Sequence, residues 1–462
     1  MAWVQRPLLK ACGGAAGRRA TPLLQAFRGA AGRREMSAAA TKADVIIVGS
    51  GIMGLNIAFQ IKKRDPTLAV TVLEQAADLG FGSSGYSTGF QRIFYTFDTT
   101  MQFAVTGTQA YKEWQAYLQD DTAEASFTET GALWMIGKSK QDNVAMQNRL
   151  ANFHVTSDVL DEADFRKRFP MMNPEPFPKF DADFNEVAQN LGPFSALFEQ
   201  GSGHIDASTC LADLARVVKR QNVQLRFKAK VDSVITKDNR KGDGAEVQGV
   251  KLADGSEISC PVVVNAAGPW FNKLNDSLGV KLSTTALPVR IQVAHKCIDG
   301  EYLNMPFTAD NWGPSGIYFM PRKANNQLVF GSVDHRFESE IVDPDKYNRG
   351  LDPDFKQEYL NALFHRLPGL PQNGAIVGFS SMYTVNQEDV HPMIGETKAK
   401  GFWACNGFSG HGFKLAPAVG SMLAQQITGK WLKGELGESD IPHAFMGPYR
   451  EPLVGKAKGV FA

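Results

Sequence analysis

The stretch Asp44-Val45-Ile46-Ile47-Val48-Gly49-Ser50-Gly51-Ile52-Met53-Gly54 decides the fold of this 462-residue chain. Residues 44–48 have the apolar, β-branched composition of a parallel strand that is buried on both faces. Residues 55–61 follow with the apolar spacing of a helix. A strand, a glycine-rich turn and a helix in this order predict a Rossmann-type α/β domain that binds a dinucleotide.

Each glycine of this loop has a physical task in such a domain. The first, Gly49, makes the tight turn; Gly51 lets the backbone approach the pyrophosphate; Gly54 lets the helix pack on the strand. The pyrophosphate then meets unpaired N–H groups at the start of the helix. The loop residues expected to bind the cofactor are Gly49, Ser50, Gly51, Ile52, Met53 and Gly54.

The end of the second strand narrows the choice of dinucleotide. Residues 69–73 form a strand-like run that ends in Glu74, 20 positions after Gly54 (74 − 54). An acid at this place accepts hydrogen bonds from the adenosine ribose hydroxyls and repels a 2′-phosphate. The site is therefore expected to prefer FAD or NAD to NADP.

Three later segments favour FAD over NAD. Residues 228–234 resemble the strand beside the adenine, and residues 262–270 are a strand that ends in small residues. Residues 407–414 precede a helical run over 415–426, and such a helix start can stabilise negative charge on the reduced flavin. Outside the first loop, the expected cofactor residues are Glu74, Ser83, Ser84, Arg92, Val231, Ala266, Ala267, Gly268, Gly407, Ser409, Gly410, Gly412, Phe413 and Lys414.

The first 34 residues differ in kind from the rest of the chain. They are rich in arginine, contain no acid and lack the continuous apolar core of a secretory signal. This composition predicts a mitochondrial transit peptide over residues 1–40, disordered and outside the fold. A disordered basic tail and a chloroplast address are the alternatives.

Composition excludes several other classes of protein. Lys plus Arg (49) nearly equals Asp plus Glu (48), so no basic surface for nucleic acid is expected. There is no run of about 18 apolar residues, the length that a membrane-spanning helix needs. The five cysteines lie far apart, without the spacing of a zinc site. No metal is expected.

Three of these motifs together resemble the D-amino-acid oxidase superfamily. They are the first glycine loop, Asn265-Ala266-Ala267-Gly268-Pro269-Trp270, and Phe408-Ser409-Gly410-His411-Gly412-Phe413-Lys414. Within it, the chain looks closest to the sarcosine oxidase and dimethylglycine dehydrogenase branch, over about residues 43–435. It also resembles mitochondrial FAD-dependent oxidoreductase domain-containing proteins, one of which is linked to respiratory complex assembly.

The resemblance implies roles for particular residues. Lys414 would bind the substrate carboxylate, and Arg92, in Gly89-Phe90-Gln91-Arg92, would contact the flavin or structure its loop. Tyr383 is expected in the substrate pocket, and His411 is a candidate base with a structural role as its alternative. With Lys414, these two are the candidate catalytic residues. His391 is expected to be structural.

The chain departs from the sarcosine oxidase pattern at three positions. Ser381 replaces the flavin-linked cysteine, so a thioether at this position is excluded. Tyr95 replaces a second carboxylate-binding arginine, which leaves the substrate less certain. Val329 occupies the place of an oxygen-activating lysine, so the chain looks more like a dehydrogenase than an oxidase.

The cofactor segments imply a discontinuous FAD-binding domain over 41–126, 200–283 and 376–436. Residues 127–199 and 284–375 would form a substrate domain. In its second part, strand-like runs at 288–294, 316–320 and 328–333 predict an antiparallel sheet that covers the flavin. Residues 437–462 are expected to be a C-terminal tail.

The leading functional hypothesis is a mitochondrial FAD-dependent oxidoreductase of the matrix or the matrix face of the inner membrane. It would transfer hydride from a small amino acid or N-methyl amine, at a CH-NH or CH-NH2 group, to flavin N5. Its electron acceptor would be other than oxygen, such as the respiratory chain. The alternatives are a flavoprotein that assists assembly of the respiratory NADH dehydrogenase complex and a 2-hydroxy-acid dehydrogenase.

Overall fold

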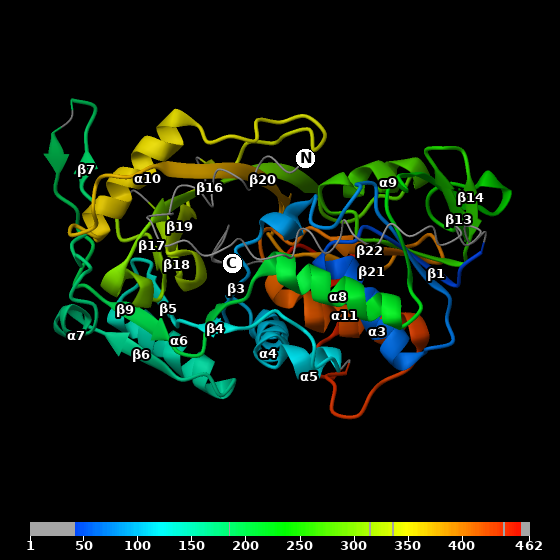
Figure 1. Ribbon diagram of the computed structural model, residues 1–462, viewed down its shortest axis with the longest axis horizontal. Helices are drawn as coiled ribbons and strands as arrows, with labels where there is room; N and C mark the ends of the chain where they lie inside the picture. Colours follow the sequence, from blue (N-terminus) through cyan, green and yellow to red (C-terminus); the bar gives the residue numbers. More distant parts are fainter. Residues whose placement is uncertain (1–41, 184, 314–315, 335–336, 438, 454–462) are drawn as a thin grey trace, which may run out of the picture.

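The computed structural model describes residues 42–183, 185–313, 316–334, 337–437 and 439–453. Two large sheets lie side by side in Figure 1, with helices packed around the right-hand one. The expected transit peptide, residues 1–40, lies outside the described residues, and the C-terminal tail is described only in part. The two sheets give the mixed α/β architecture that the sequence predicts.

The right-hand sheet has six strands and carries the predicted dinucleotide loop. All neighbouring strands are parallel except the last two, which are antiparallel. Their order is β11 (Gln224–Arg226), β2 (Val70–Leu73), β1 (Val45–Val48), β15 (Val262–Asn265), β22 (Phe402–Asn406) and β21 (Met393–Glu396). The predicted strand that precedes Gly49 is therefore the inner strand β1.

Helices cover one face of this sheet, and a smaller sheet covers the other. Helix α3 (Ile52–Arg64) lies next to α8 (Ala207–Arg220) and α11 (Gly412–Thr428) in Figure 1. On the opposite face, Ile46 and Val263 share a core cluster with Val250 and Leu278. Val250 belongs to the antiparallel sheet of β12 (Val231–Thr236), β13 (Val247–Leu252) and β14 (Glu257–Ser259). Leu278 belongs to α9 (Phe271–Leu278). Strand β1 is thus buried on both faces, as its composition predicts.

The left-hand sheet has eight strands. Their order is β20 (Ile376–Asn386), β16 (Ala286–Cys297), β19 (Gln327–Ser332), β18 (Ile317–Arg322), β17 (Phe307–Asp310), β5 (Ala132–Met135), β9 (Ala196–Glu199) and β6 (Ser157–Leu160). The antiparallel pairing of β16, β19 and β18 agrees with the sequence prediction. The parallel pair β17–β5 was not predicted.

Strand β20 differs from the prediction because it belongs to the eight-stranded sheet. Residues 376–386 were assigned to the FAD-binding domain, yet they pair with β16 from Ala286↔Asn386 to Lys296↔Ile376. This long antiparallel pairing satisfies the backbone of β20 along its whole length. Strand β20 is therefore part of the eight-stranded sheet. The boundaries of the two domains remain a prediction.

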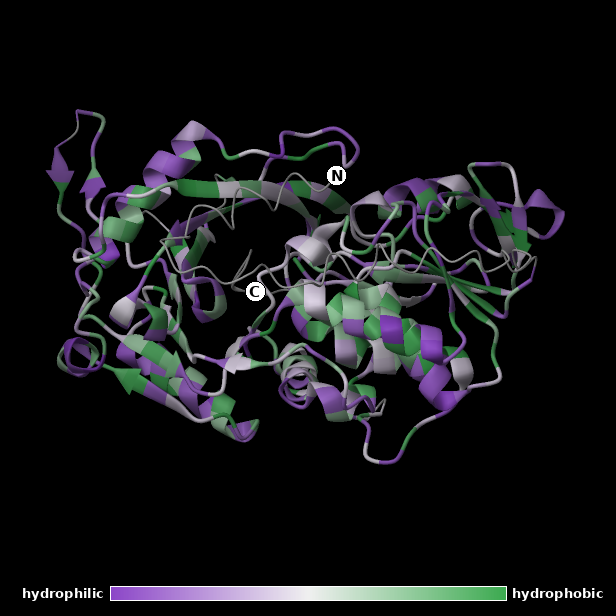
Figure 2. Cartoon of the chain, viewed as in Figure 1, coloured by the Kyte–Doolittle hydropathy of each residue, from purple (hydrophilic) through white to green (hydrophobic). Residues whose placement is uncertain are grey.

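Shorter elements connect the sheets and their helices. They are η1 (Ser83–Tyr86), β3 (Phe90–Gln91), α4 (Asp98–Lys112), α5 (Trp114–Leu118), β4 (Thr128–Glu129), α6 (Lys140–Asn152), α7 (Glu162–Arg168), β7 (Lys179–Phe180), β8 (Glu186–Val187), β10 (Gly203–His204), η2 (Lys237–Asn239), η3 (Gly268–Trp270), η4 (Gly300–Asn304), η5 (Lys323–Asn325), α10 (Pro353–Arg366) and η7 (His443–Met446). In Figure 2, the long strands β16 and β20 alternate between green and paler or purple segments, whereas the projecting hairpin of β7 and β8 is mostly purple.

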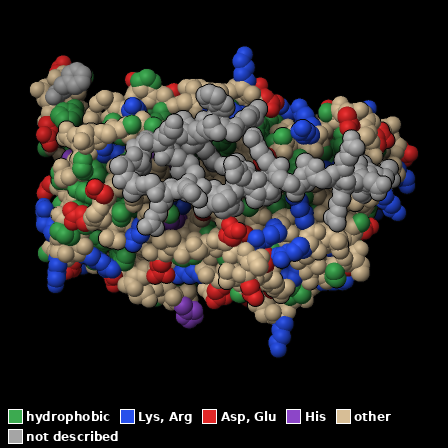
Figure 3. All heavy atoms as spheres, in the orientation of Figure 1, with side chains coloured by type: hydrophobic (Ala, Val, Ile, Leu, Met, Phe, Trp, Pro, Cys, Tyr) green, Lys and Arg blue, Asp and Glu red, His purple; other side chains and the backbone are tan. Residues whose placement is uncertain are grey.

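The surface carries charges of both signs. In Figure 3, blue Lys and Arg side chains are interspersed with red Asp and Glu side chains over the visible face. Among the described residues, we find no helix with the length and apolar content that a membrane span requires.

Candidate active site

A cavity lies between the carboxyl ends of β1, β2 and β15 and the inner face of the eight-stranded sheet. It brings together segments from three distant parts of the chain. The predicted site residues that line it are Gly49, Gly51, Ile52, Met53, Glu74, Ser83, Ser84, Val231, Ala266, Ala267, Gly268, Tyr383, Ser409, Gly410, Gly412, Phe413 and Lys414. The carboxyl edge of a parallel sheet is where α/β folds bind ligands.

The three glycines of the first loop have the close approaches that their predicted tasks require. Gly49 has a φ of +106°, and a Cβ there would lie 2.5 Å from the carbonyl oxygen of Ala266. A Cβ on Gly54 would lie 1.9 Å from the Gly49 carbonyl oxygen. Gly51 instead borders the cavity beside Ser84, whose Oγ accepts a hydrogen bond from the Ile52 N–H at 3.0 Å. Of the three glycines, Gly51 is the one with no backbone atom within 4 Å of a Cβ, so a ligand can approach the chain there.

Glu74 is held at the edge of the cavity by its neighbours. Its Oε2 accepts hydrogen bonds from the backbone N–H and the hydroxyl of Ser50 at 3.0 and 2.9 Å. Its Oε1 accepts one from the Ala76 N–H at 2.9 Å. Ser50 is buried and, like Gly54, does not line the cavity, so its part is to orient the carboxylate. A direct contact of Ser50 with the cofactor stays a prediction.

The glycine-rich segment before α11 forms the opposite end of the cavity. Ser409 has a φ of +47°, donates its N–H to the Thr384 carbonyl at 2.9 Å and accepts a hydrogen bond from the Asn386 N–H at 3.0 Å. A Cβ on Gly410 would lie 2.8 Å from the ring of Tyr383. Strand β20 therefore shapes this turn, because its backbone and its tyrosine both press against it.

Helix α11 begins at this turn without a side-chain cap. Gly412, Phe413 and Lys414, its first three residues, all line the cavity. The N–H groups of a first helical turn have no partner within the helix. Together with the helix dipole, they make this end of the cavity favourable for a negative charge, as the sequence predicts for the flavin N1–C2=O region.

Lys414 brings a cation to the same place. Its Nζ donates a hydrogen bond to the Gly410 carbonyl at 3.3 Å. Burial, and to a smaller degree the positive charge of Arg92, lowers the pKa of Lys414 to about 7. A lysine with this pKa is protonated in part near neutrality, so it can bind a carboxylate or hold a proton there.

Arg92 itself does not line the cavity. Its guanidinium donates to the Phe94 carbonyl at 2.8 Å and lies 4.1 Å from the centre of the Tyr95 ring. Of the two predicted roles, the geometry favours structuring the loop over contacting the flavin. Tyr95 is also absent from the lining, because its ring is buried between Arg92 and His411.

His411 and Gly407 do not border the cavity either. The imidazole of His411 is buried and lies edge-on to Tyr95, with ring centres 5.2 Å apart. His411 is the N-cap residue of α11, and its ring packs against Tyr95. The predicted catalytic role of His411 is therefore not supported, and its structural alternative fits the geometry.

Aromatic residues of the eight-stranded sheet form the wall that faces the dinucleotide loop. Tyr383, Phe379 and Tyr318 all lie in this wall. Burial, reinforced by the charge of Glu338, raises the pKa of Tyr383 well above its usual range, so its hydroxyl is neutral. The sequence predicts Tyr383 for this pocket but not Phe379. The alternation of residues 379, 381 and 383 along one face of β20 could have identified it.

The remaining departures from the sarcosine oxidase pattern occupy different places. Ser381 lines the cavity, in keeping with a position close to the cofactor. Val329 does not line it; on β19 it pairs with His295 on one side and Met320 on the other. Val329 thus lies two residues along β19 from Gly331, the partner of Tyr318.

The lining fits a flavin dinucleotide. Gly51 and the start of α3 provide a place for a pyrophosphate, Glu74 for ribose hydroxyls, and the start of α11 for the flavin ring. Further lining residues that sequence reasoning did not name are Phe81, Tyr86, Lys273 and Asn406. Among the described residues, no group of three or more His, Cys, Asp or Glu side chains could hold a metal.

The chain is similar to known proteins over most of its length. A family model described as FAD dependent oxidoreductase, DAO, matches residues 44–426. FAD-dependent oxidoreductase domain-containing protein 1 of Xenopus laevis is 26% identical, covering 84% of this chain and 79% of that protein. Monomeric sarcosine oxidase of Bacillus sp. (strain B-0618) is 26% identical, covering 85% and 94%. The crystal structure of glycine oxidase from Geobacillus kaustophilus matches in fold with a TM-score of 0.70 at 18% identity, covering 89% and 99%.

Proposed function

This chain belongs to the DAO family of FAD dependent oxidoreductases, and we propose that it oxidises a small amino acid or N-methyl amine at its CH–N bond. The observation that carries this proposal is the cavity that joins the dinucleotide loop to Lys414 and the aromatic wall. A pocket that is mostly apolar but has a few convergent polar groups is the usual form of a small-molecule site.

Different side chains of the cavity bind different parts of the substrate. Lys414 binds the substrate carboxylate, and the first turn of α11 holds negative charge beside it. The ring faces of Tyr318, Phe379 and Tyr383 favour an amine in this position. FAD, when bound, supplies the hydride acceptor at N5. Since such a hydride transfer depends mainly on orientation, it needs few further side chains.

The cellular setting is part of the same proposal. The arginine-rich leader supports mitochondrial import. Val329 at the place of the oxygen-activating lysine supports a dehydrogenase, whose electrons pass to an acceptor such as the respiratory chain. An assembly role without turnover is the weaker alternative. Tyr95, one of the altered positions, does not line the cavity, so its change gives little support to a loss of chemistry.

Anaerobic mixing of the FAD-loaded protein with candidate substrates tests the proposal. The panel contains sarcosine, dimethylglycine, D- and L-amino acids and 2-hydroxy acids, and the measurement is the loss of flavin absorbance. Bleaching by at least one amine is expected. Bleaching by hydroxy acids alone, or by no compound, would contradict an amine substrate.

A further inference from the structure

Three basic side chains gather beyond the aromatic wall of the cavity. Arg322, at the end of β18, lies 3.0 Å from Nδ1 of His204 and donates to the carbonyl of Thr88, which lines the cavity. His295 of β16 lies nearby, because it pairs with Val329 of β19, and Val329 pairs with Met320, two residues before Arg322 on β18. We call Arg322, His204 and His295 the basic cluster.

The basic cluster lacks a counter-ion among the described residues. Arg322 forms no ion pair there, and its hydrogen bonds go to neutral acceptors. The carboxylate of Asp206, whose charge also acts on Arg322, caps α8 through the Thr209 N–H at 2.8 Å. A largely desolvated guanidinium whose direct hydrogen bonds all go to neutral groups is one that a bound anion would stabilise further.

Unused hydrogen-bonding atoms point to the same conclusion. Both ring nitrogens of His295, and Nε2 of His204, are buried without a hydrogen-bond partner among the described residues. The His204 side chain itself belongs to a residue that is only 7% exposed. Buried polar atoms are normally paired, so three unpaired ring nitrogens around one guanidinium need an explanation. A bound carboxylate can accept hydrogen bonds from histidine N–H groups and from arginine together.

The basic cluster continues the wall of the cavity. On β16, Val293 lines the cavity, and His295 is two residues further on the same face of the strand. The ring of Phe379, also in the lining, lies 5.6 Å from the ring of His295. Two residues along a strand advance about 7 Å, so the basic cluster lies within about one strand repeat of the cavity lining.

We propose that the basic cluster binds a side-chain carboxylate of the substrate. The substrate is then a dicarboxylic amino acid or its N-methyl derivative, with its α-carboxylate at Lys414 and its distal carboxylate at Arg322. This inference rests on the proposed amine oxidation, since it names the substrate class of the same cavity. Arg322 also gives the site a second cation for binding the substrate. In the sarcosine oxidase pattern, an arginine stands at the position that Tyr95 occupies here.

Binding of non-reacting ligands tests the proposal without turnover. Isothermal titration calorimetry of the oxidised, FAD-loaded full chain compares glutarate, a dicarboxylate, with butyrate, a monocarboxylate. We expect glutarate to bind at least about tenfold more tightly, because it adds a charge-assisted contact. In Arg322→Gln this preference is lost while butyrate affinity stays the same. Lys323→Gln, the same charge change at the adjacent exposed residue, keeps the preference.

Equal affinity for the two ligands in the unaltered protein, or an undiminished preference in Arg322→Gln, would overturn the proposal. If Arg322→Gln loses FAD or unfolds, His295→Phe decides in its place, because it retains a ring of similar size. A reduced glutarate preference then supports the basic cluster, and an unchanged one contradicts it. Anaerobic bleaching is measured separately, so a failure of amine oxidation is distinguishable from a failure of dicarboxylate binding.

Discussion

Lys414 is the residue whose environment most directly shapes the chemistry of the cavity. Burial and the nearby charge of Arg92 lower its pKa to about 7. The cationic form exists below that pH and is lost above it. Its ability to attract a carboxylate should therefore fall as the pH rises through 7.

We expect butyrate affinity to decrease about fivefold from pH 7 to 8 and about tenfold from pH 8 to 9, in proportion to the remaining lysine cation. Calorimetry of the FAD-loaded protein between pH 6 and 9 measures this dependence. In Lys414→Met, binding should be weaker and nearly independent of pH. Lys433→Met, which removes an exposed lysine, should retain the pH dependence; if it does not, Lys414 is not the titrating group.

Gly54 provides a second prediction at the scale of one residue. A Cβ there would lie 1.9 Å from the Gly49 carbonyl oxygen, so Gly54→Ala must separate α3 from the loop. Overpacking of this kind costs about 1–3 kcal/mol or more, and it would misplace the pyrophosphate site. We expect loss of FAD on purification and a lower thermal midpoint.

Gly437→Ala is the matched control, because the nearest atom to its Cβ is at 4.0 Å. This variant should retain FAD in the same ratio as the unaltered protein. Full FAD retention by Gly54→Ala would show that the loop has more freedom than the geometry indicates.

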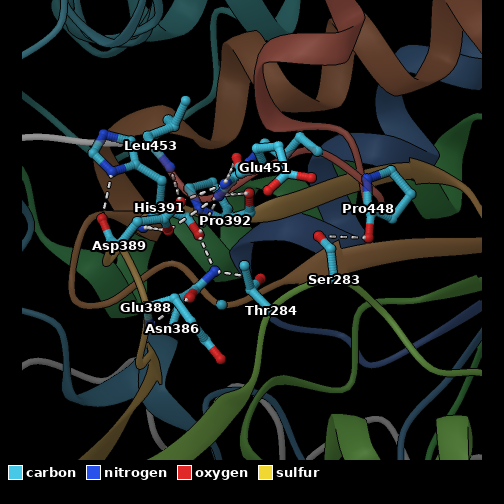
Figure 4. Close-up of polar contacts among 12 residues, drawn as sticks. Ser283, Thr284, Asn386, Glu388, Asp389, His391, Pro392, Pro448, Glu451 and Leu453 are labelled. Carbon is cyan, nitrogen blue, oxygen red and sulfur yellow. Dashed lines mark hydrogen bonds and ion pairs between the residues drawn. The ribbon is translucent and has the colours of Figure 1, made fainter.

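At the scale of elements, residues 447–453 form hydrogen bonds with the turn that follows β20. Figure 4 shows Leu453 donating its N–H to Asp389, at 2.7 Å, and Pro448 accepting from Ser283. Arg450 forms a two-pronged ion pair with Asp389 and also donates to the His391 carbonyl at 3.2 Å. We call residues 447–453 the C-terminal strap.

The C-terminal strap is connected to the flavin end of the cavity through Asn386. The side chain of Asn386 donates to the His391 carbonyl at 2.6 Å, and its backbone N–H donates to Ser409 Oγ at 3.0 Å. His391 therefore has the structural place that the sequence predicts: its Nδ1 lies 2.8 Å from the Asp389 carbonyl, and the cavity lining does not include it.

Arg450→Met should destabilise the C-terminal strap by about 3 kcal/mol, because Asp389 is fully buried and would lose its cation. Hydrogen exchange at the strap and the thermal midpoint of the protein measure the loss. The double variant Arg450→Met/Asp389→Asn should recover part of it, since no buried charge then remains. An additive double variant would show that the ion pair contributes little.

The pH dependence of the C-terminal strap follows from Asp389. Burial raises the pKa of this carboxyl, but hydrogen bonds from Arg450, Leu453 and His391 outweigh burial, so the net pKa is lowered. A lowered pKa stabilises the fold above the unfolded value, about 4, and this contribution is lost as the pH falls through the folded value. Exchange in the strap should therefore increase below about pH 4, and Asp389→Asn should remove this increase.

At the scale of the whole molecule, the two large sheets meet around the cavity, and a loop of the substrate side closes over its edge. Asp345 accepts a hydrogen bond from the Trp270 indole N–H at 2.7 Å and pairs with Lys273. Both partners line the cavity, and Phe81 stacks on Trp270 with ring centres 5.9 Å apart. The loop that contains Asp345 thus holds Trp270, and with it Phe81, at the edge of the cavity.

Asp345→Ala should release FAD about five- to tenfold faster, because it removes one hydrogen bond and one partly exposed ion pair that hold the edge closed. Stopped-flow transfer of FAD to an apo-acceptor protein measures the rate. Asp354→Ala, at an exposed acid in the first turn of α10, should leave the rate unchanged. Equal rates in all three proteins would mean that the loop does not retain FAD.

Much of this organisation could be predicted from local sequence. The glycine spacing around Gly51, the strand that ends in Glu74 and the start of α11 each depend on neighbours in the chain. Backbone geometry and hydrogen bonding over a few residues are enough to specify such turns and helix starts. The comparisons confirm the FAD-dependent family that these motifs predict.

Side-chain direction and long-range pairing could not be read in the same way. Arg92 and His411 carry matching motifs, yet both turn into the protein instead of the cavity. Strand β20 joins the substrate sheet, and Arg322, His204 and His295 meet from three different strands. These outcomes depend on register and on packing between segments that are far apart in the sequence. Local spacing therefore establishes the cofactor and the family, whereas tertiary packing selects which side chains face the cavity.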